Sequence, residues 1–325
     1  MKPQAGARPK IARRAVHGVL LLDKDPGLSS NAALQRARRL LRAEKAGHTG
    51  TLDPLASGLL PLCFGAATKF AQASLDADKR YLATLQLGVT TTTGDAEGEV
   101  LATRPVTADR ATVERACAGF VGTILQLPPM YSALKRDGKP LYEYARAGIE
   151  LEREPRRVTI HAIAVVAGEG DRWTLDIACS KGTYIRTLGE EIGAALGCGA
   201  HLAALRRTRA GALDVGAAIK LAQLEARDDA SLAACLRPCD ALLAHWPRLV
   251  LSADDAGRFL AGVRRRLDLP DAPALRVYGP GADEFLGTAH ASGGELIATR
   301  LLSPAEVGAP PIHRALLEEP ESLSA

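Results

Sequence analysis

The chain has 325 residues, of which 47% are hydrophobic, which predicts a globular protein with one large domain and a smaller one rather than a disordered chain. No apolar run approaches the roughly 18 residues of a membrane span, and the N-terminus lacks the apolar stretch of a secretory signal, so we expect a cytoplasmic protein without a membrane partner. The formal net charge is only +4, and the six cysteines are scattered, which favours reduced thiols over a zinc site.

The N-terminal arm, residues 1–16, is basic. Its first fourteen residues contain five lysines and arginines and no acid. We expect this arm to be flexible, and it fits either a polyanionic partner such as nucleic acid or an ordinary solvated tail.

Residues 17–47 are expected to form a strand followed by a helix. A short strand runs through residues 19–22, a Pro-Gly turn follows, and Ser29, Ser30 or Asn31 caps the helix. The end of this region, QRARRLLRAEKAG, is rich in arginine and leads directly into an unusual loop.

The loop GHTGTLDPLASG, residues 47–58, places one acid, Asp53, among small and turn-forming residues. Three glycines and Pro54 argue against a helix or an ordinary strand. From residue type alone, Asp53 fits a nucleophile, a general base, a metal ligand or an Asx-turn, with the turn favoured. A magnesium site is a weaker interpretation because no further carboxylate is near in sequence, and the Gly-Lys-Ser/Thr ending of a phosphate loop is missing.

The elements after this loop mix strands and helices without a regular βα period, which favours an α+β fold. Alternating apolar residues predict strands at 81–89, 158–166 and 173–179, and helical spacing predicts helices at 107–120 and 185–196. Residues 127–150, rich in Pro, Tyr and Lys, indicate either an excursion from the sheet that closes over a partner or an inert surface insertion.

The last part of the chain is expected to form a separate small domain. A boundary near Pro247 follows a helical stretch, and the short strands and Gly-rich turns beyond it are typical of a small barrel or sheet. The acidic C-terminal end is expected to fray. The predicted organisation is the arm 1–16, a main domain 17–246 and a C-terminal domain 247–325.

The segment AGHTGTLDPLASGLLPLCFGAATKF closely resembles the catalytic segment of the tRNA pseudouridine-55 synthase family (TruB type). Five further blocks occur in family order: LLDKDPGLSSN, DKRYLATLQLG, LPPMYSALKRDGKPLYEYAR, CSKGTYIRTLGEEIG and AHLAALRRTRAG. The resemblance implies the pseudouridine synthase fold, a mixed and mainly antiparallel sheet with flanking helices. It also implies that residues 127–150 clasp RNA, and it likens the C-terminal domain to the small RNA-binding (PUA-like) β domain of the family.

The activity implied by this resemblance is isomerisation of the T-loop uridine, position 55 of tRNA, to pseudouridine. The N-glycosidic bond breaks, the freed uracil turns, and carbon 5 rejoins the ribose, so neither a cofactor nor a metal is expected. By similarity, Asp53 is the essential aspartate and Arg186 pairs with it and keeps it ionised. Tyr81 is implied to stack on the target base and to assist proton removal.

Four further residues are given roles by the same resemblance. Tyr184 and Leu205 are implied to line the pocket, His48 to contact nucleotides displaced around the flipped base, and Lys24 to support the loop. Without the resemblance, Tyr184 and Leu205 also fit ordinary core residues. Extruding a base costs a few kcal/mol, which phosphate contacts are expected to offset. The candidate contacts are Arg36, Arg39, Arg206, Arg207 and Arg209, and each of them also fits a solvated surface residue, which is the commoner case for a single arginine.

We therefore expect a stand-alone tRNA isomerase that binds the T-arm stem-loop as a monomer without a guide RNA. Two other functions fit part of the sequence: a tRNA-folding chaperone that needs no catalysis, and a uridine glycosidase that releases uracil. The sequence leaves open whether Asp53 attacks the sugar, attacks the uracil ring or promotes elimination.

Overall fold

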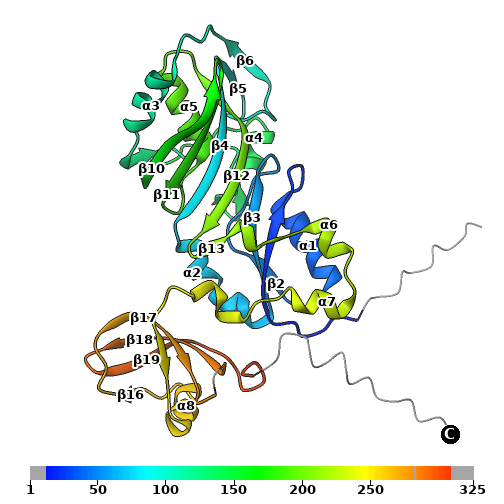
Figure 1. The fold of residues 1–325 in the computed structure, drawn as a ribbon, viewed down its shortest axis with the longest axis vertical. Helices are drawn as coiled ribbons and strands as arrows, with labels where there is room; N and C mark the ends of the chain where they lie inside the picture. The colour runs from blue at the N-terminus through cyan, green and yellow to red at the C-terminus, as the bar shows by residue number, and fades with distance from the viewer. Residues whose placement is uncertain (1–11, 282, 309–325) are drawn as a thin grey trace, which may run out of the picture.

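The computed structural model describes residues 12–281 and 283–308 and contains two large β-sheets, one above the other in Figure 1. The larger sheet has ten strands. Eight of them lie in the spatial order β14 (Ile219–Lys220), β1 (Gly18–Lys24), β3 (Ser57–Phe64), β12 (Ala200–Ala210), β4 (Lys79–Leu87), β11 (Arg172–Cys179), β10 (Arg156–Glu169) and β7 (Gly122–Gln126). The other two are β2 (Ala46–His48), which pairs with β3, and β13 (Leu213–Asp214), which pairs with β12. The β1–β14 and β3–β12 pairs are parallel, and the others are antiparallel. The predicted α+β class with a mixed, mainly antiparallel sheet is confirmed.

Short helices flank the large sheet (Figure 1). They are α1 (Ser30–Leu40), η1 (Gly65–Phe70), α2 (Ala71–Asp76), α3 (Arg110–Ala118), α5 (Ile185–Ala195), η2 (Val215–Ala217), α6 (Leu221–Glu225), α7 (Asp229–Ala234) and η3 (Cys239–Leu243). The helices α3 and α5 pack against β10 and β12, whereas α1 and α6 lie against β2 and β1. None of the helices in the described part of the chain has the length and apolar character that a membrane crossing requires.

The first strand and helix form as predicted: the apolar run is buried as a strand, and a serine caps the helix. All seven residues of β1 are buried. The Ser29 hydroxyl caps α1 by accepting a hydrogen bond from the Ala32 amide at 3.1 Å. The loop between β2 and β3 is shorter than predicted and spans residues 49–56, since the flanking residues pair in the sheet. These strands fix both ends of the loop that carries Asp53.

A β-bulge changes the face that β10 presents to the core. The sequence predicts Val158 to Val166 as one alternating buried face, but the register shifts between Ile160 and Ala162. Val165 is therefore 8% exposed, whereas Val166 is 49% exposed. The predicted face is wrong beyond Ile160, because an alternating pattern does not reveal an inserted residue.

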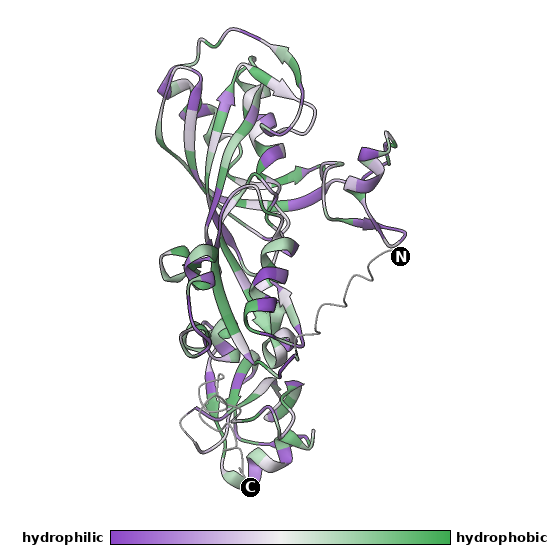
Figure 2. Cartoon of the chain, turned by 90° about the vertical axis from the view of Figure 1, so that its right-hand side faces the viewer, coloured by the Kyte–Doolittle hydropathy of each residue, from purple (hydrophilic) through white to green (hydrophobic). Residues whose placement is uncertain are grey.

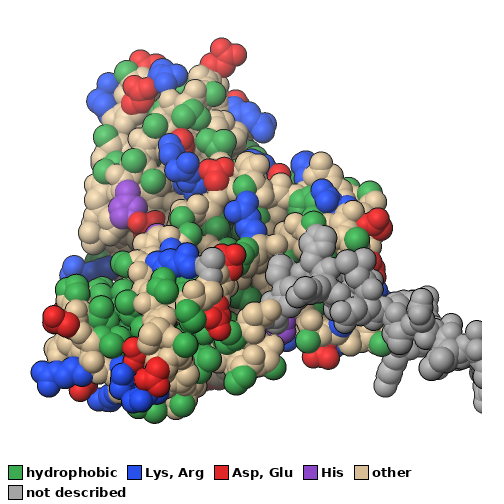
Figure 3. Space-filling model, turned by 60° about the horizontal axis from the view of Figure 1, so that its bottom comes forward, with side chains coloured by type: hydrophobic (Ala, Val, Ile, Leu, Met, Phe, Trp, Pro, Cys, Tyr) green, Lys and Arg blue, Asp and Glu red, His purple; other side chains and the backbone are tan. Residues whose placement is uncertain are grey.

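The second sheet begins at β15, just after the predicted boundary at Pro247. Its strands, in spatial order, are β15 (Arg248–Val250), β17 (Ala272–Tyr278), β18 (Phe285–Ser292), β19 (Glu295–Leu301) and β16 (Arg265–Arg266), and α8 (Ala253–Leu260) packs beside β16. Phe285 stacks edge-on against Phe70 of η1 with the ring centroids 5.1 Å apart, which joins the two sheets. Figure 3 shows positive and negative side chains interspersed at this end of the molecule, without one continuous basic face.

Two segments lie at the margins of this architecture. The predicted insertion contains β8 (Lys135–Arg136), β9 (Lys139–Pro140) and α4 (Leu141–Arg146), and it projects from the side of the large sheet (Figure 2). Residues 12–16 of the predicted flexible arm are packed on the body instead, since Val16 is 1% exposed and the Arg14 amide donates to the Arg42 carbonyl at 2.8 Å. Residues 1–11 and the acidic C-terminal end lie outside the described residues.

Candidate active site

The loop 49–56 is fixed from beneath by a serine of α1. The Ser30 hydroxyl accepts a hydrogen bond from the Leu52 amide at 2.7 Å and donates one to the Leu52 carbonyl at 2.9 Å. The Ala56 amide donates to the Asp53 carbonyl at 3.0 Å and closes a turn around the acid. The backbone on both sides of Asp53 is therefore held in place.

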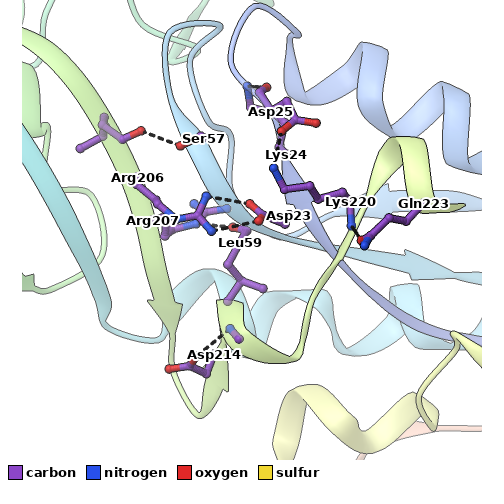
Figure 4. Close-up of polar contacts among 12 residues, drawn as sticks. Asp23, Lys24, Asp25, Ser57, Leu59, Arg206, Arg207, Asp214, Lys220 and Gln223 are labelled. Atoms are coloured by element: carbon purple, nitrogen blue, oxygen red, sulfur yellow. Dashed lines mark hydrogen bonds and ion pairs between the residues drawn. The ribbon is translucent and has the colours of Figure 1, made fainter.

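Lys24 holds the same loop from β1. Its ammonium group donates to the carbonyl of Asp25 at 3.0 Å (Figure 4). It also donates to the carbonyls of Leu28 at 2.7 Å and Pro54 at 3.4 Å. The side chain is 1% exposed, and this burial lowers the pKa of Lys24 to about 8. Lys24 thus contacts the loop backbone from within the protein and does not present its ammonium group to solvent.

Arg186, at the start of α5, is the partner of Asp53. One guanidinium nitrogen lies 3.0 Å from the Asp53 carboxylate, and Nε lies 3.5 Å from the carboxylate of Asp95. The same guanidinium donates to the carbonyls of Thr93 at 3.1 Å and Tyr131 at 2.5 Å. The Arg186 side chain is 6% exposed, so its charge is compensated inside the protein by two acids, of which the sequence indicated only one.

Asp95 and Glu97, on the hairpin between β5 (Val89–Thr91) and β6 (Val100–Thr103), are acids that sequence reasoning missed. Asp95 accepts hydrogen bonds from the Thr93 hydroxyl at 2.6 Å and the Glu97 amide at 3.1 Å. Burial and then the charges of Asp95 and Asp53 raise the pKa of Glu97. Both acids are more than forty residues from Asp53 in sequence, and only the fold brings them to the loop.

Tyr81, Leu205 and Arg207 share one face of the sheet. In the β4–β12 ladder, Tyr81 lies opposite Arg207 and Leu205 lies opposite Ala83. Tyr81 is half-buried, Leu205 is buried in the main core, and burial above all raises the pKa of the Tyr81 hydroxyl. Tyr81, predicted at the start of its strand, is the third residue of β4, and Leu205 lies on the same face of the sheet.

Tyr184 immediately precedes α5 and is held by a buried glutamine, Gln126. The Gln126 side chain accepts from the Tyr184 amide at 2.7 Å and donates to the Tyr184 carbonyl at 3.1 Å. Burial raises the pKa of Tyr184, and the charge of Asp53 acts in the same direction. Gln126 is 1% exposed at the end of β7, and nothing in its sequence context marked it as a site residue.

His48 ends β2, next to the loop. Its Nδ1 atom is buried and makes no hydrogen bond within the described part of the chain. Burial and then the charge of Arg207 lower the pKa of His48, so the ring is neutral near pH 7. A neutral, half-buried imidazole suits a contact with a base better than one with a phosphate.

The arginines expected to contact phosphate are mostly engaged elsewhere. Arg206 makes a two-pronged ion pair with Asp23 at 2.9 Å (Figure 4). Arg209 pairs with Asp214 at 2.8 Å. Arg207 is 1% exposed, so its expected contact with a phosphate is wrong. Arg36 lies 4.0 Å from Glu225, and Arg39 donates to the carbonyl of Gln35. Alternation could not tell which arginines of β12 point inward, because a second bulge lies between Arg207 and Arg209.

Two family models match the chain. The first, described as "TruB family pseudouridylate synthase (N terminal domain)", matches residues 38–185, and the second, "tRNA pseudouridylate synthase B C-terminal domain", matches residues 186–244. The first match contains Asp53 and Tyr81, and the second begins at Arg186. The matches end before β15.

Curated proteins resemble the chain over most of its length. A "tRNA pseudouridine synthase B" of Burkholderia lata is 58% identical, with 93% of this chain and 95% of that protein covered. The protein of the same name from Cupriavidus taiwanensis is 57% identical, with 92% and 98% covered.

Solved structures share the fold. A chain of a Cbf5-Nop10-Gar1 complex superposes with a TM-score of 0.69 at 26% identity, covering 91% of this chain and 86% of that one. A chain of an H/ACA RNP bound to a substrate RNA gives a TM-score of 0.68 at 23% identity, covering 89% and 86%. These neighbours agree with the mixed sheet described above.

Proposed function

The chain belongs to the TruB family of pseudouridylate synthases and is a tRNA uridine-to-pseudouridine isomerase, and we propose that Asp53 is its essential carboxylate. The proposal includes the T-loop uridine at position 55 as the target. It further includes action in the cytoplasm as a monomer without a guide RNA. A chaperone that needs no catalysis is not favoured, because the relatives that match nearly the whole chain are named as synthases.

The observation that carries the assignment is the difference in solvent exposure between the two acids that pair with Arg186. The side chain of Asp53 is 40% exposed, whereas that of Asp95 is 5% exposed. A carboxylate that reacts with RNA must be reachable, and one that orients an arginine need not be. Asp53 therefore takes the reacting role, and Asp95 holds the guanidinium from its buried side.

The chemistry requires little more than a positioned carboxylate and a pocket for the flipped base. The C1′–N1 bond breaks, a C1′–C5 bond forms, C5 loses a proton and N1 gains one, so atoms and electrons balance without a cofactor. A carboxylate that adds covalently and later leaves would divide this exchange into two easier steps. Holding Asp53 on a fixed loop means that little reorganisation is needed when the base arrives.

The remaining site residues have supporting roles in the proposal. Tyr81 stacks on the extruded base, and Tyr184 and Leu205 line the pocket around it. His48, neutral and next to the loop, occupies the space that the base leaves. Lys24 supports the loop from beneath.

The test is mapping of pseudouridine in a T-loop stem-loop RNA by carbodiimide adducts and primer extension. We expect a stop at the T-loop uridine with the wild-type chain and RNA alone, none with Asp53→Asn, and a wild-type stop with Asp171→Asn, which changes an exposed acid in the turn after β10. RNA of unchanged mass excludes base release. A rate for Asp53→Asn within tenfold of wild type would overturn the role of Asp53.

A further inference from the structure

Arg207 is a buried cation that the proposed reaction does not use. It is 1% exposed and is among the largest fully buried side chains of the protein. Within residues 12–281 and 283–308 it forms no ion pair with a carboxylate, unlike its neighbours Arg206 and Arg209. Burying a charge without an opposite charge is unfavourable, so its presence calls for a reason.

The guanidinium is held by backbone carbonyls of the site. Nε donates to the Leu59 carbonyl at 2.7 Å (Figure 4). One terminal nitrogen donates to the Gly50 carbonyl at 3.2 Å. Gly50 lies in the loop three residues before Asp53. Packing fixes the backbone of Arg207 as well, because a Cβ atom at Gly58 would lie 2.3 Å from its carbonyl oxygen. These contacts occupy two of the N–H donors of the guanidinium, and neither partner carries a negative charge.

The phenol of Tyr81 is the functional group that faces this charge. Tyr81 and Arg207 are directly opposite in the β4–β12 ladder, where paired side chains share a face and lie close together. Burial raises the pKa of Tyr81, and the charge of Arg207 and its hydrogen bond to the tyrosine side chain oppose that rise. The other ionisable groups facing the phenol are Cys179 of β11 and Asp53 of the loop, and both raise its pKa further.

We propose that Arg207 is a positioning residue that holds the Tyr81 phenol at the site and stabilises its ionised oxygen during proton removal. The proposal rests on the proposed function, in which carbon 5 loses a proton after it has joined the ribose. The Tyr81 phenol first loses its own proton to solvent, and the phenolate then takes the proton of C5, while the electron pair of the C5–H bond returns to the ring and N1 takes a proton from solvent. Arg207 is 1% exposed, so an RNA phosphate does not reach its charge.

The experiment measures the titration of Tyr81 in the free protein, so it needs no catalysis. All tyrosines are replaced by the more acidic 3-fluorotyrosine, and the ¹⁹F resonance of residue 81 is assigned from its loss in Tyr81→Phe. Arg207→Met and Arg207→Gln remove the charge, one with an apolar and one with a polar side chain, and Arg207→Lys keeps it. The control is Arg172→Gln, which removes an exposed arginine from the same sheet. Circular dichroism checks that each variant is folded.

We expect Tyr81 to titrate about one pH unit or more higher in both neutral variants than in the wild type. Arg207→Lys should restore most of the shift, and Arg172→Gln should match the wild type. The ascending limb of the single-turnover rate against pH, which the ionisation of a general base sets, should move in parallel, with RNA affinity changed less than about threefold, since lost proton transfer is a defect in rate rather than in binding.

An unchanged Tyr81 titration in a folded neutral variant would overturn the proposal. So would the failure of both neutral variants to fold, because Arg207 would then serve only the fold. Neither result concerns Asp53. Failure of the proposed function shows itself separately, as activity in Asp53→Asn.

Discussion

The loop 49–56 and the insertion 127–150 both belong to the proposed RNA site, but the protein holds them in opposite ways. The loop is fixed by buried side chains from three other elements: Ser30 of α1, Lys24 of β1 and Arg207 of β12. The insertion holds itself together with local contacts. The Leu141 amide donates to the Leu134 carbonyl at 2.7 Å, and the Lys139 ammonium lies 4.7 Å from the ring centroid of Tyr144.

This difference indicates a division of labour between chemistry and capture. Buried polar groups with long-range partners fix a reactive group before the substrate arrives. A projecting segment with local contacts can change its position at low cost and adapt to RNA. The two regions meet at the start of α5, where Arg186 contacts both the Asp53 carboxylate and the Tyr131 carbonyl.

Breaking this junction should have the largest effect. Arg186→Gln removes the partner of Asp53 and leaves Asp95 buried and uncompensated. We expect the single-turnover rate to fall by about 10²- to 10³-fold and the free energy of unfolding by about 3 kcal/mol. Arg186→Lys keeps the charge and should recover part of the stability but little of the rate. A rate for Arg186→Gln within tenfold of wild type would contradict this account.

Disturbing the scaffold under the loop should mainly reduce stability. Gly58 has a φ of +97°, and a Cβ atom there would lie 2.3 Å from the Arg207 carbonyl oxygen. Gly58→Ala should therefore lower the free energy of unfolding in urea by about 3 kcal/mol. Gly47→Ala is the matched control, because a Cβ atom at Gly47 meets nothing within 4 Å. Equal losses for the two variants would mean that the backbone is not constrained at Gly58.

Weakening the link between β7 and the residue before α5 should affect the rate more than RNA binding. Gln126→Leu keeps the size of the side chain but leaves the Tyr184 amide and carbonyl without their partner. We expect a rate about tenfold lower and a stability loss of about 2 kcal/mol, with similar RNA affinity. Gln72→Leu, an exposed substitution on α2, is the control. A loss of affinity without loss of rate would place Gln126 in RNA binding instead.

Removing charge from the tip of the insertion should weaken RNA binding more than it lowers the rate. Lys135 and Arg136 of β8 are both exposed, and we propose that they contact the RNA backbone. The double change to Gln should weaken RNA binding and reduce the salt dependence of log Kd by up to about 2. The melting temperature should stay the same. An unchanged salt slope would argue that the insertion does not contact phosphate.

The last expected effect is on the pH dependence of stability, and it leaves RNA binding and the rate aside. Burial lowers the pKa of Lys79, whose ammonium donates to three backbone carbonyls, to about 8. Between about pH 8 and 10.5 the unfolded chain binds more protons than the folded one, so stability contributed by this group rises with pH. Lys79→Met should remove that part of the rise in urea unfolding, and Lys135→Met should not. Identical pH profiles for both variants would contradict the effect of burial.

The sequence located the loop and most of its neighbours but not the forces that hold them. Asp53 stood out because a turn-rich loop with one acid is a local signal, and the ordered family blocks identified Arg186. Asp95 and Gln126 carried no local signal, because their roles arise from contacts across 91 and 58 residues. Arg207 was misjudged, since the bulge in β12 decides which arginines are buried.

Hydrogen exchange of the free protein and of its complex with the T-loop stem-loop tests the central claim most directly. We expect the amides of Thr49, Leu52 and Ala56, all hydrogen-bonded, to be protected in the free protein, and those of residues 133–139 to become protected when RNA binds. A loop that exchanges freely without RNA and gains protection together with the insertion would contradict a site formed in advance.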